Sequence, residues 1–364
     1  MKLHIITNRE ELYACQSQWD RLAAENSFFS WDWNVSWFRE LSDSKDSPFV
    51  MVGLDGDDNW IGIAPLFISN RALRLLGSGT ACTDYANLIC PDEHYQAFAD
   101  AIAQYLVRNI QPDGSLSRIN LLELEGGAHN DHLLNYFCDQ LAALGLTQHQ
   151  LETEGTWKVQ LPESSQQLTQ MLSSSTRRKV RKARKRLAAE NVSVEFATPA
   201  NFETIWTHFV ELHQKRRIQL GEPGCFADPT FEAFLKNAIR GLLDRELADL
   251  FIIYNSEVPC ASQLLIHSES SCMMYQSGVN PDFLSDEPGY QAIVVAMDRG
   301  IERGAAFYDF LRGDESYKSR WNTTREPILR RRFIPRKLSA QLKHNTWVAG
   351  RTIKNYFTSM MQPT

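Results

Sequence analysis

Apolar residues follow two periodicities along the first 150 residues, and their alternation predicts a chain of mixed helices and strands. Helical spacing covers residues 9–24, and aromatic residues dominate a second helical segment over 28–41. Two β-type runs flank the polar pair Asp57–Asp58, which predicts a hairpin. The remaining pattern predicts, in order, short strands and a loop over 72–90, a helix over 95–109, a strand over 118–124 and a helix over 132–144.

A similar order of patterns begins again after about residue 155. It opens with a strand, two short helices, another strand and a long helix. A three-strand meander follows, then a helix that begins at a Pro-Gly pair, a strand, a helix and a last strand. The expected ranges are 156–161, 165–172, 177–186, 192–198, 201–217, 248–280, 289–304, 305–313, a helix from about 316, and 329–335.

The repeated order of elements predicts two domains of one architecture, which also agrees with about 100–200 residues per domain. The expected fold class is α/β (α+β), with two tandem domains that each contain a mixed, mostly antiparallel sheet flanked by helices. We place the first domain at residues 1–150 and the second at 151–337. Residues 338–364 have helical spacing and are expected to form a tail over the surface.

Charge is unevenly distributed along the chain. The net charge is −6, yet the segment 177–186 holds eight basic residues in ten and no acid, so the remainder carries −14. Such a segment is either a solvated, ion-paired helix face or a platform for a phosphorylated ligand, a tRNA or an anionic membrane.

Several familiar site classes lack support in the sequence. The seven cysteines are scattered, with no CxxC pair and no zinc spacing, so reduced thiols and no metal site are expected. The N-terminal segment carries charges where a signal peptide needs an apolar run, and no apolar run reaches the 18 residues of a membrane span. We therefore expect a cytoplasmic protein without a metal cofactor.

The C-terminal half carries a series of motifs. A Ser/Thr cluster leads into the basic helix, and a later helix carries Leu212, His213 and Arg217. The meander ends in Tyr275 and Gly278, and the run DFLRGDESYK follows from Asp309 to Lys318. Over residues 155–335 these motifs resemble the acyltransferase domain of the GNAT superfamily, in the CelD-like group often associated with cellulose biosynthesis. That group is related to the FemAB-type aminoacyltransferases.

The resemblance implies direct transfer of an acyl group, most simply acetyl, from acyl-CoA to an amine or hydroxyl of a small or sugar-like acceptor. Tyr317 would be the general acid for the leaving thiolate, and a phenol suits this role because the two pKa values differ by about 1.5 units. Asp309, at the end of an apolar strand, would orient or deprotonate the acceptor, with Glu315 as the alternative base. A packing tyrosine and an ion-paired aspartate are the structural alternatives.

The same resemblance assigns the donor and acceptor contacts. A helix N-terminus binds anions, so the helix that begins at Pro288, Gly289 and Tyr290 is expected to hold the donor pyrophosphate. The usual glycine-rich pyrophosphate loop is absent there, and the acids Asp286 and Glu287 precede the helix. Further donor contacts are expected from Tyr275, Gly278, Lys318, Arg178 and Arg181, and acceptor contacts from His213, Arg217, Asp84 and Tyr85.

Two rival interpretations remain from the sequence. The first keeps the fold and takes aminoacyl-tRNA as the donor, with the basic helix as its platform. The second is a non-catalytic binding module that contacts a polysaccharide-synthesis complex or a membrane through the basic helix and the tail. The catalytic hypothesis makes one geometric prediction: Asp309 and Tyr317 open into one pocket that is reachable from Gly289.

Overall fold

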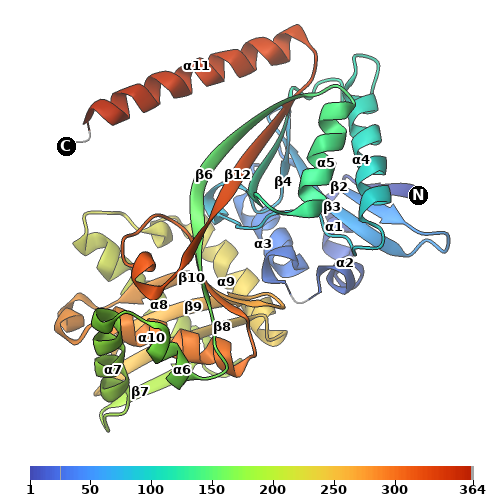
Figure 1. Cartoon of the computed structure of the whole chain (residues 1–364). Helices are drawn as coiled ribbons and strands as arrows, with labels where there is room; N and C mark the ends of the chain where they lie inside the picture. The colour runs from blue at the N-terminus through green and yellow to red at the C-terminus, as the bar shows by residue number, and fades with distance from the viewer. Residues whose placement is uncertain (25, 362–364) are drawn as a thin grey trace.

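The computed structural model describes residues 1–24 and 26–361 (Figure 1). Its N-terminal half alternates helices and strands much as the sequence pattern predicts, with an additional first strand. The elements are β1 (Lys2–Ile6), α1 (Arg9–Ala14), α2 (Gln16–Ala23), α3 (Trp31–Leu41), β2 (Ser47–Leu54), β3 (Trp60–Ser69), β4 (Ala72–Leu75), α4 (Tyr95–Ile110), β5 (Leu121–Ala128) and α5 (His132–Ala143).

The C-terminal half repeats this plan and adds a helix that the sequence pattern did not reveal, α9. Its elements are β6 (Thr147–Gln160), α6 (Ser165–Met171), α7 (Ser174–Leu187), β7 (Val192–Phe196), α8 (Phe202–Gln219), α9 (Pro229–Asp244), β8 (Ala248–Asn255), β9 (Val258–His267), β10 (Ser271–Val279), α10 (Pro288–Glu302), β11 (Phe307–Arg312), β12 (Thr324–Ile334) and α11 (Leu338–Met361).

Strand pairing confirms the repeated topology. The antiparallel meander β2–β3–β4 is followed by α4 and by β5, which pairs parallel to β4. The meander β8–β9–β10 is likewise followed by α10 and by β11, which pairs parallel to β10. The expected mixed α/β fold with helices flanking a mostly antiparallel sheet is therefore confirmed.

The two halves share one sheet because they exchange their last strands. The strand order is β1-β2-β3-β4-β5-β12-β6-β11-β10-β9-β8-β7. Strand β6, which follows α5, pairs with β11 of the C-terminal half, and β12 returns to pair with β5 of the N-terminal half. The long β6–β12 ladder joins them (Figure 1). The sheet is thus continuous instead of divided in two, and β6 runs across the boundary expected near residue 150.

Three apolar clusters fill the layers, and the middle one belongs to both halves. Helices α4 and α5 cover one face of the N-terminal strands, and α6, α7 and α10 cover one face of the C-terminal strands. Helices α1–α3 and α8–α9 pack together in the shared cluster. At its centre α3 and α9 are so close that a Cβ on Gly241 would lie 2.2 Å from Asp32 Oδ1. Burial across this contact fixes the two halves against one another.

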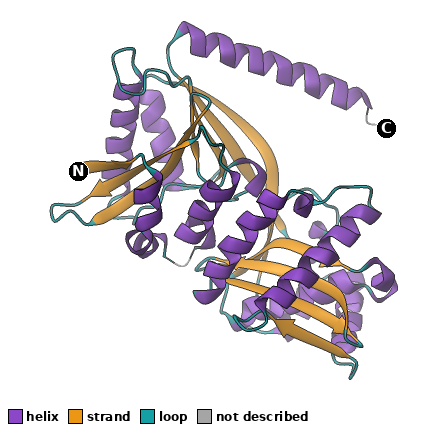
Figure 2. Ribbon diagram, turned by 180° about the vertical axis from the view of Figure 1, so that it is seen from behind, coloured by secondary structure: helices purple, strands orange, loops and turns teal. Residues whose placement is uncertain are grey.

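Two helices were expected near the C-terminus, one from about Ser316 and one in the tail. The helix expected from about Ser316 is wrong: the chain makes only a short 3₁₀ turn over Lys318–Trp321 before β12 begins. The tail expected over residues 338–364 contains α11, which leaves the end of β12 and, beyond its first turns, projects from the body (Figures 1 and 2). Residues 362–364 lie outside the described residues. The first turns of α11 pack on the sheet through Ala340 and His344, whereas Leu338 and Leu342 are exposed.

Candidate active site

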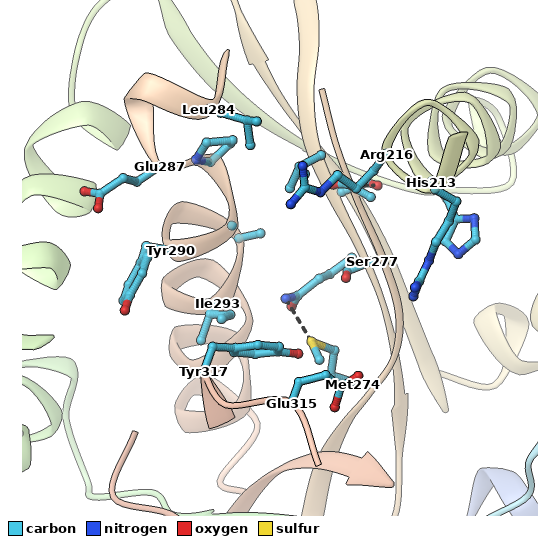
Figure 3. A pocket seen from close by; sticks show the side chains of 18 of the residues that line it. His213, Arg216, Met274, Ser277, Leu284, Glu287, Tyr290, Ile293, Glu315 and Tyr317 are labelled. Carbon is cyan, nitrogen blue, oxygen red and sulfur yellow. Dashed lines mark hydrogen bonds between the residues drawn. The ribbon is translucent and has the colours of Figure 1, made fainter. Parts of the chain in front are cut away.

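A cavity lies between α8, β10 and the N-terminal end of α10. Its volume is about 510 Å³ (Figure 3). Tyr317 and Glu315 stand at one end, Leu284 and Glu287 at the other, and His213 with Arg216 along one side (Figure 3). Eight of the residues expected from the sequence line it: His213, Arg217, Gly278, Pro288, Gly289, Tyr290, Glu315 and Tyr317.

The cavity exists because two parallel strands separate. Strands β10 and β11 pair only from Ser271–Phe307 to Met273–Asp309. A bulge between Met274 and Gln276 then bends β10, while it stays paired with β9 as far as Val279. On the side of β10 that faced β11, strand pairing ends among the described residues. The open backbone edge beside the cavity can therefore offer N–H groups to a ligand.

The N-terminus of α10 faces this opening. Pro288 occupies the first helical turn, and a Cβ placed on Gly289 would meet no described atom within 4 Å. Glu287 precedes them with φ 55°, and its carboxylate lies 3.1 Å from Lys179 Nζ and 3.5 Å from Lys182 Nζ. These cations also hold the pKa of Glu287 below its ordinary value against the opposing effect of burial. The acid next to the helix end is therefore balanced by positive charge from α7.

Tyr317 and Glu315 reach the cavity from the turn after β11. The Tyr317 ring packs edge-on to Phe310, with ring centroids 6.0 Å apart. Burial, followed by the nearby Glu315 carboxylate, raises the pKa of Tyr317 above its ordinary value. The phenol therefore keeps its proton at neutral pH and can donate it to a developing anion in the cavity.

Helix α8 brings His213 and Arg217 to the opposite wall. Burial lowers the pKa of His213 to about 4, so the ring is neutral at pH 7. Its Nε2 lies 3.6 Å from the Cys225 thiol, and Arg217 forms an ion pair with Glu222 at 2.7 Å. The close crossing of α8 over β10 requires Gly278, because a Cβ there would lie 2.5 Å from the backbone nitrogen of His213.

Asp309 does not open into this cavity, and the expectation that it shares a pocket with Tyr317 is wrong. The residue is fully buried at the junction of the two halves. Its Oδ2 accepts a hydrogen bond from the Tyr85 hydroxyl at 2.5 Å, and its Oδ1 accepts one from the backbone N–H of Leu311 at 2.8 Å. Burial raises the pKa of Asp309 to about 7 in spite of these hydrogen bonds. The sequence pattern could not foresee this, because the partner lies 224 residues away.

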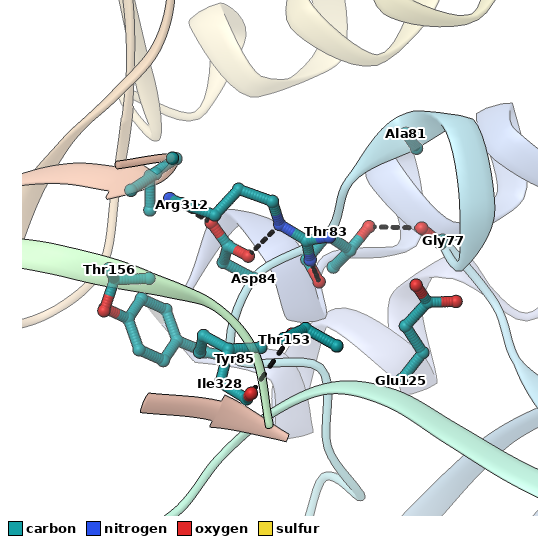
Figure 4. A network of polar contacts seen from close by, with 12 residues as sticks. Gly77, Ala81, Thr83, Asp84, Tyr85, Glu125, Thr153, Thr156, Arg312 and Ile328 are labelled. Atoms are coloured by element: carbon teal, nitrogen blue, oxygen red, sulfur yellow. Dashed lines mark hydrogen bonds and ion pairs between the residues drawn. The ribbon is translucent and has the colours of Figure 1, made fainter. Parts of the chain in front are cut away.

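Asp84 belongs to the same junction, not to the cavity. Its carboxylate accepts hydrogen bonds from Arg312 Nε at 2.5 Å and from the Arg312 backbone N–H at 2.9 Å (Figure 4). The Tyr85 oxygen also accepts a hydrogen bond from the Thr156 hydroxyl at 2.8 Å, so the loop that carries both residues is fixed to β6 and β11. Asp84 and Tyr85 therefore hold the C-terminal half against the N-terminal half.

The other expected donor contacts lie outside the cavity lining. Tyr275 is half-buried at the junction and donates to the carbonyl oxygen of Ala81 at 2.7 Å. Lys318 is 1% exposed and donates to the carbonyl oxygens of Leu311, Arg312 and Gly313 at 2.7–3.1 Å. Arg178 and Arg181 are exposed on α7.

The structure adds cavity residues that the sequence interpretation missed. Gln263 is buried in the middle of β9, where its Nε2 donates to the Met274 sulfur at 3.2 Å and its Oε1 accepts from the Tyr308 hydroxyl at 3.2 Å. An amide side chain between the apolar segments of this strand was the available signal. Arg216 is the second, hidden among the neighbouring basic residues of α8.

Part of the C-terminal half matches a known family of acyl-transferring enzymes. Residues 174–319 match the family model of the acetyltransferase (GNAT) domain, and this segment contains α7, the meander, α10, β11 and Tyr317. This part of the C-terminal half is thus similar in sequence to GNAT acetyltransferase domains. No protein of curated function matches the sequence. The narrower resemblance to the CelD-like group stays a prediction.

Solved structures extend the likeness in fold to both halves. FemX aligns over 94% of this chain and 99% of its own, at 13% identity and a TM-score of 0.63. The C-terminal domain of a putative lysylphosphatidylglycerol synthetase from Agrobacterium fabrum aligns over 92% and 95%, at 10% identity and a TM-score of 0.55. L-PGS from Bacillus licheniformis aligns over 80% and 86%, at 11% identity and a TM-score of 0.50. These similarities concern the fold alone.

The described residues offer neither a metal site nor a membrane-spanning helix. They contain no group of three or more His, Cys, Asp or Glu side chains placed to hold a metal ion. None of the helices traced between residues 1 and 361 combines the length and apolarity that crossing a membrane requires.

Proposed function

We propose that the C-terminal domain, residues 151–337, transfers an acyl group from acyl-CoA to an amine or hydroxyl acceptor in the cavity between α8, β10 and α10. The observation that carries the proposal is the convergence of three features on one cavity: the splay of β10 from β11, the open N-terminus of α10, and the Tyr317 hydroxyl. The N-terminal domain, residues 1–150, serves as a scaffold that fixes β6 and β11.

The donor phosphates would lie at the first turn of α10. Free N–H groups and the helix dipole favour an anion there, and Gly289 leaves room for it to approach the backbone. Lys179 and Lys182 already lie beside this end of the helix through their ion pairs with Glu287. A bound pyrophosphate would share these cations with the carboxylate.

Chemistry would then occur at the other end of the cavity. The attacking amine or hydroxyl adds to the thioester carbonyl, and the C–S bond breaks as the tetrahedral intermediate collapses. Tyr317 donates its proton to the departing sulfur, Glu315 is placed to accept the acceptor proton, and the open edge of β10 is placed to stabilise the oxyanion.

Asp309 takes a positioning role in this proposal. It accepts the N–H of Leu311, a non-glycine residue held at φ 54°, at the point where the pairing of β11 with β6 is interrupted. Such a backbone conformation costs about 1–3 kcal/mol and persists only where its surroundings impose it. By holding this bend, Asp309 directs the following turn, and with it Tyr317, toward the cavity.

Aminoacyl-tRNA is the second candidate donor. The observation in its favour is the exposed basic surface of α7, where Arg178 and Arg181 stand away from the Glu287 ion pairs. A non-catalytic binding module, with α11 as its contact to a membrane or a polysaccharide-synthesis complex, is the third. An acyl-CoA donor agrees with a cytoplasmic location, which remains part of this proposal.

One experiment separates the three candidates. Acetyl-CoA, longer acyl-CoAs, CoA and bulk tRNA are titrated into the wild-type protein and two double variants, with binding measured by calorimetry and thermal shift. The acyl-CoA proposal expects Lys179→Gln/Lys182→Gln to weaken acyl-CoA binding at least about tenfold, since two charge-assisted contacts are lost. The matched control Arg178→Gln/Arg181→Gln should leave it within about twofold, because exposed charges elsewhere contribute little.

The contrary results are equally specific. If tRNA binds and acyl-CoA does not, and the Arg178/Arg181 variant abolishes that binding, the donor is aminoacyl-tRNA. If none of the ligands binds the wild-type protein, the binding-module interpretation replaces both.

A further inference from the structure

A second cavity, of about 270 Å³, lies on the N-terminal half at the root of α11. It is bounded by the starts of β4 and β5, by the end of β12 and by the first turns of α11, which leaves β12 close to these strands (Figure 1). Five cationic side chains and a single carboxylate, Glu123, line it. The cations are Arg71, Arg74, Arg330, Arg332 and Lys343.

Strand pairing explains how these charges come together. Cross-strand pairs place Arg74 opposite Glu123, Glu123 opposite Arg332, and Arg332 opposite His149. Side chains directly opposite one another share a face of the sheet, so β4, β5, β12 and β6 each contribute one member of this row. Arg330 lies two residues before Arg332 and thus on the same face, where it pairs with Glu125.

The first turns of α11 cover the row at Arg332 and His149. His344 is 9% exposed, and its ring centroid lies 5.0 Å from that of His149. Trp347 lies against Arg332, with the guanidinium carbon 3.6 Å from the ring centroid. Arg332 is only 7% exposed although it borders the cavity.

Several nitrogens at this cavity lack a hydrogen-bond partner within the described part of the chain. They are Nη1 and Nε of Arg332, Nε of Arg330 and Nδ1 of His344. The nearest carboxylate oxygen to Arg332 Nε is that of Glu123, at 3.4 Å, and Glu123 is shared with Arg74. Leaving a buried charged donor unsatisfied costs more than leaving a neutral one, so an anion that accepts these N–H groups would be bound favourably.

The charge around the cavity also favours a bound anion. Outside this region and α7 the chain is acidic, with a net charge of −6 overall. Here five cations face one lining carboxylate. Burial is the main cause that lowers the pKa of the Arg332 guanidinium, and repulsion from Arg330 and Arg74 lowers it further. A dianion with several acceptor oxygens would relieve both the repulsion and the missing hydrogen bonds.

We propose that this cavity binds a compact phosphate ester, held by Arg332 and Arg330 from the sheet and by Arg71 and Lys343 from the rim. Its volume lies at the small end of ligand pockets, which suits a phosphate with a few attached carbons better than a nucleotide. The same chemistry can come from a free metabolite or from the headgroup of an anionic lipid. Because the ligand would touch both β12 and α11, its binding would fasten α11 to the sheet.

This cavity is separate from the proposed donor site and from its counterpart in the N-terminal half. The cavity lies at the starts of the parallel strands β4 and β5. A notch equivalent to the one between β10 and β11 would instead lie beyond the ends of β4 and β5. At those ends the chain is closed: a Cβ on Gly126 would lie 2.2 Å from the carbonyl oxygen of Thr83. The proposed phosphate site is therefore not a second acyl-donor notch.

The test measures binding of glycerol 3-phosphate and of inorganic phosphate to the full chain by calorimetry, with uncharged glycerol as the negative ligand. Arg332→Gln should reduce affinity for glycerol 3-phosphate at least about tenfold through the loss of charge-assisted hydrogen bonds. Since Arg332 is buried, a second variant avoids a folding defect: Arg71→Gln/Lys343→Gln changes two exposed rim positions and should give a comparable loss. The matched control Arg336→Gln removes an exposed charge of the same segment outside the lining and should bind as the wild type does.

Vesicles distinguish the two sources of the phosphate. Sedimentation is compared for vesicles of phosphatidylglycerol mixed into phosphatidylcholine and for phosphatidylcholine alone. The ligand is a lipid headgroup if the protein binds the anionic vesicles, if both cavity variants abolish that binding, and if glycerol 3-phosphate competes with it. Binding of free glycerol 3-phosphate without vesicle binding assigns a soluble ester. The proposal is overturned if no phosphate compound binds at millimolar concentration, or if neither cavity variant weakens the binding observed.

Discussion

Two glycines of the proposed active site offer a matched pair of perturbations, because the structure gives opposite surroundings to their missing Cβ atoms. In Gly278→Ala the new methyl group would lie 2.5 Å from the backbone nitrogen of His213 and 2.7 Å from the carbonyl carbon of Leu212. These are backbone atoms of α8, so the whole helix must move away from β10. In Gly289→Ala the methyl group would meet no described atom within 4 Å.

The expected magnitudes follow from these distances. Overpacking against backbone typically costs about 1–3 kcal/mol, and we expect Gly278→Ala to lose that much free energy of unfolding. Gly289→Ala should be neutral or gain up to about 1 kcal/mol, because alanine favours a helix over glycine. Its methyl group would nevertheless enter the space proposed for the donor phosphates, so acyl-CoA affinity should fall about tenfold.

Urea denaturation gives the free energies, and calorimetry with acetyl-CoA gives the affinities. The reasoning is refuted if Gly278→Ala is as stable as the wild type, since α8 would then not press on β10 as described. It is also refuted if Gly289→Ala binds acetyl-CoA normally, since the donor would then not approach the backbone of α10.

Two further predictions concern the junction behind the cavity. The pKa of Asp309 rises from 3.8 to about 7 on folding, so its protonated form is favoured in the folded state and the associated stability is lost as pH rises through 7. Asp309→Asn, which cannot ionise, should therefore gain about 3 kcal/mol of stability relative to the wild type between pH 5 and pH 8, in urea titrations at both pH values. An unchanged difference would mean that Asp309 titrates normally. Lys318→Met leaves the carbonyl oxygens of Leu311, Arg312 and Gly313 without this donor and should cost about 2–4 kcal/mol in the same assay. A loss below about 0.5 kcal/mol would show that the turn does not depend on Lys318.

Local patterns predicted those parts of the site that depend on neighbouring residues. Pro288 and Gly289 mark the start of a helix whatever surrounds them, and the structure places both at the cavity. Tyr317 follows the strand end closely enough that the chain must return it to the same edge of the sheet. The repeated meander, helix and strand likewise followed from periodicity, because each element buries its own apolar face.

Features that depend on distant residues were beyond local reasoning. The sequence cannot show that β6 and β12 are exchanged between halves, since either strand satisfies its backbone in either position. The ion pair between Asp84 and Arg312 joins residues 228 positions apart, and the same junction takes Asp309 away from the cavity. The helix expected after Ser316 fails for a related reason: the Lys318 ammonium binds three carbonyl oxygens of the preceding loop and holds a tight turn there instead.

The central claim is that the Tyr317 hydroxyl protonates the leaving group in the cavity between α8, β10 and α10. The most direct measurement is the rate of thiol release from acetyl-CoA, with a panel of amines and amino sugars as acceptors, by Tyr317→Phe. Tyr254→Phe, a tyrosine on β8 that interacts with His208 outside the cavity, is the matched control. Loss of a general acid should lower kcat about 10²–10⁴-fold and leave KM for the donor nearly unchanged, because the ring and its packing remain. An unchanged kcat in Tyr317→Phe, or an equal loss in Tyr254→Phe, would contradict the account.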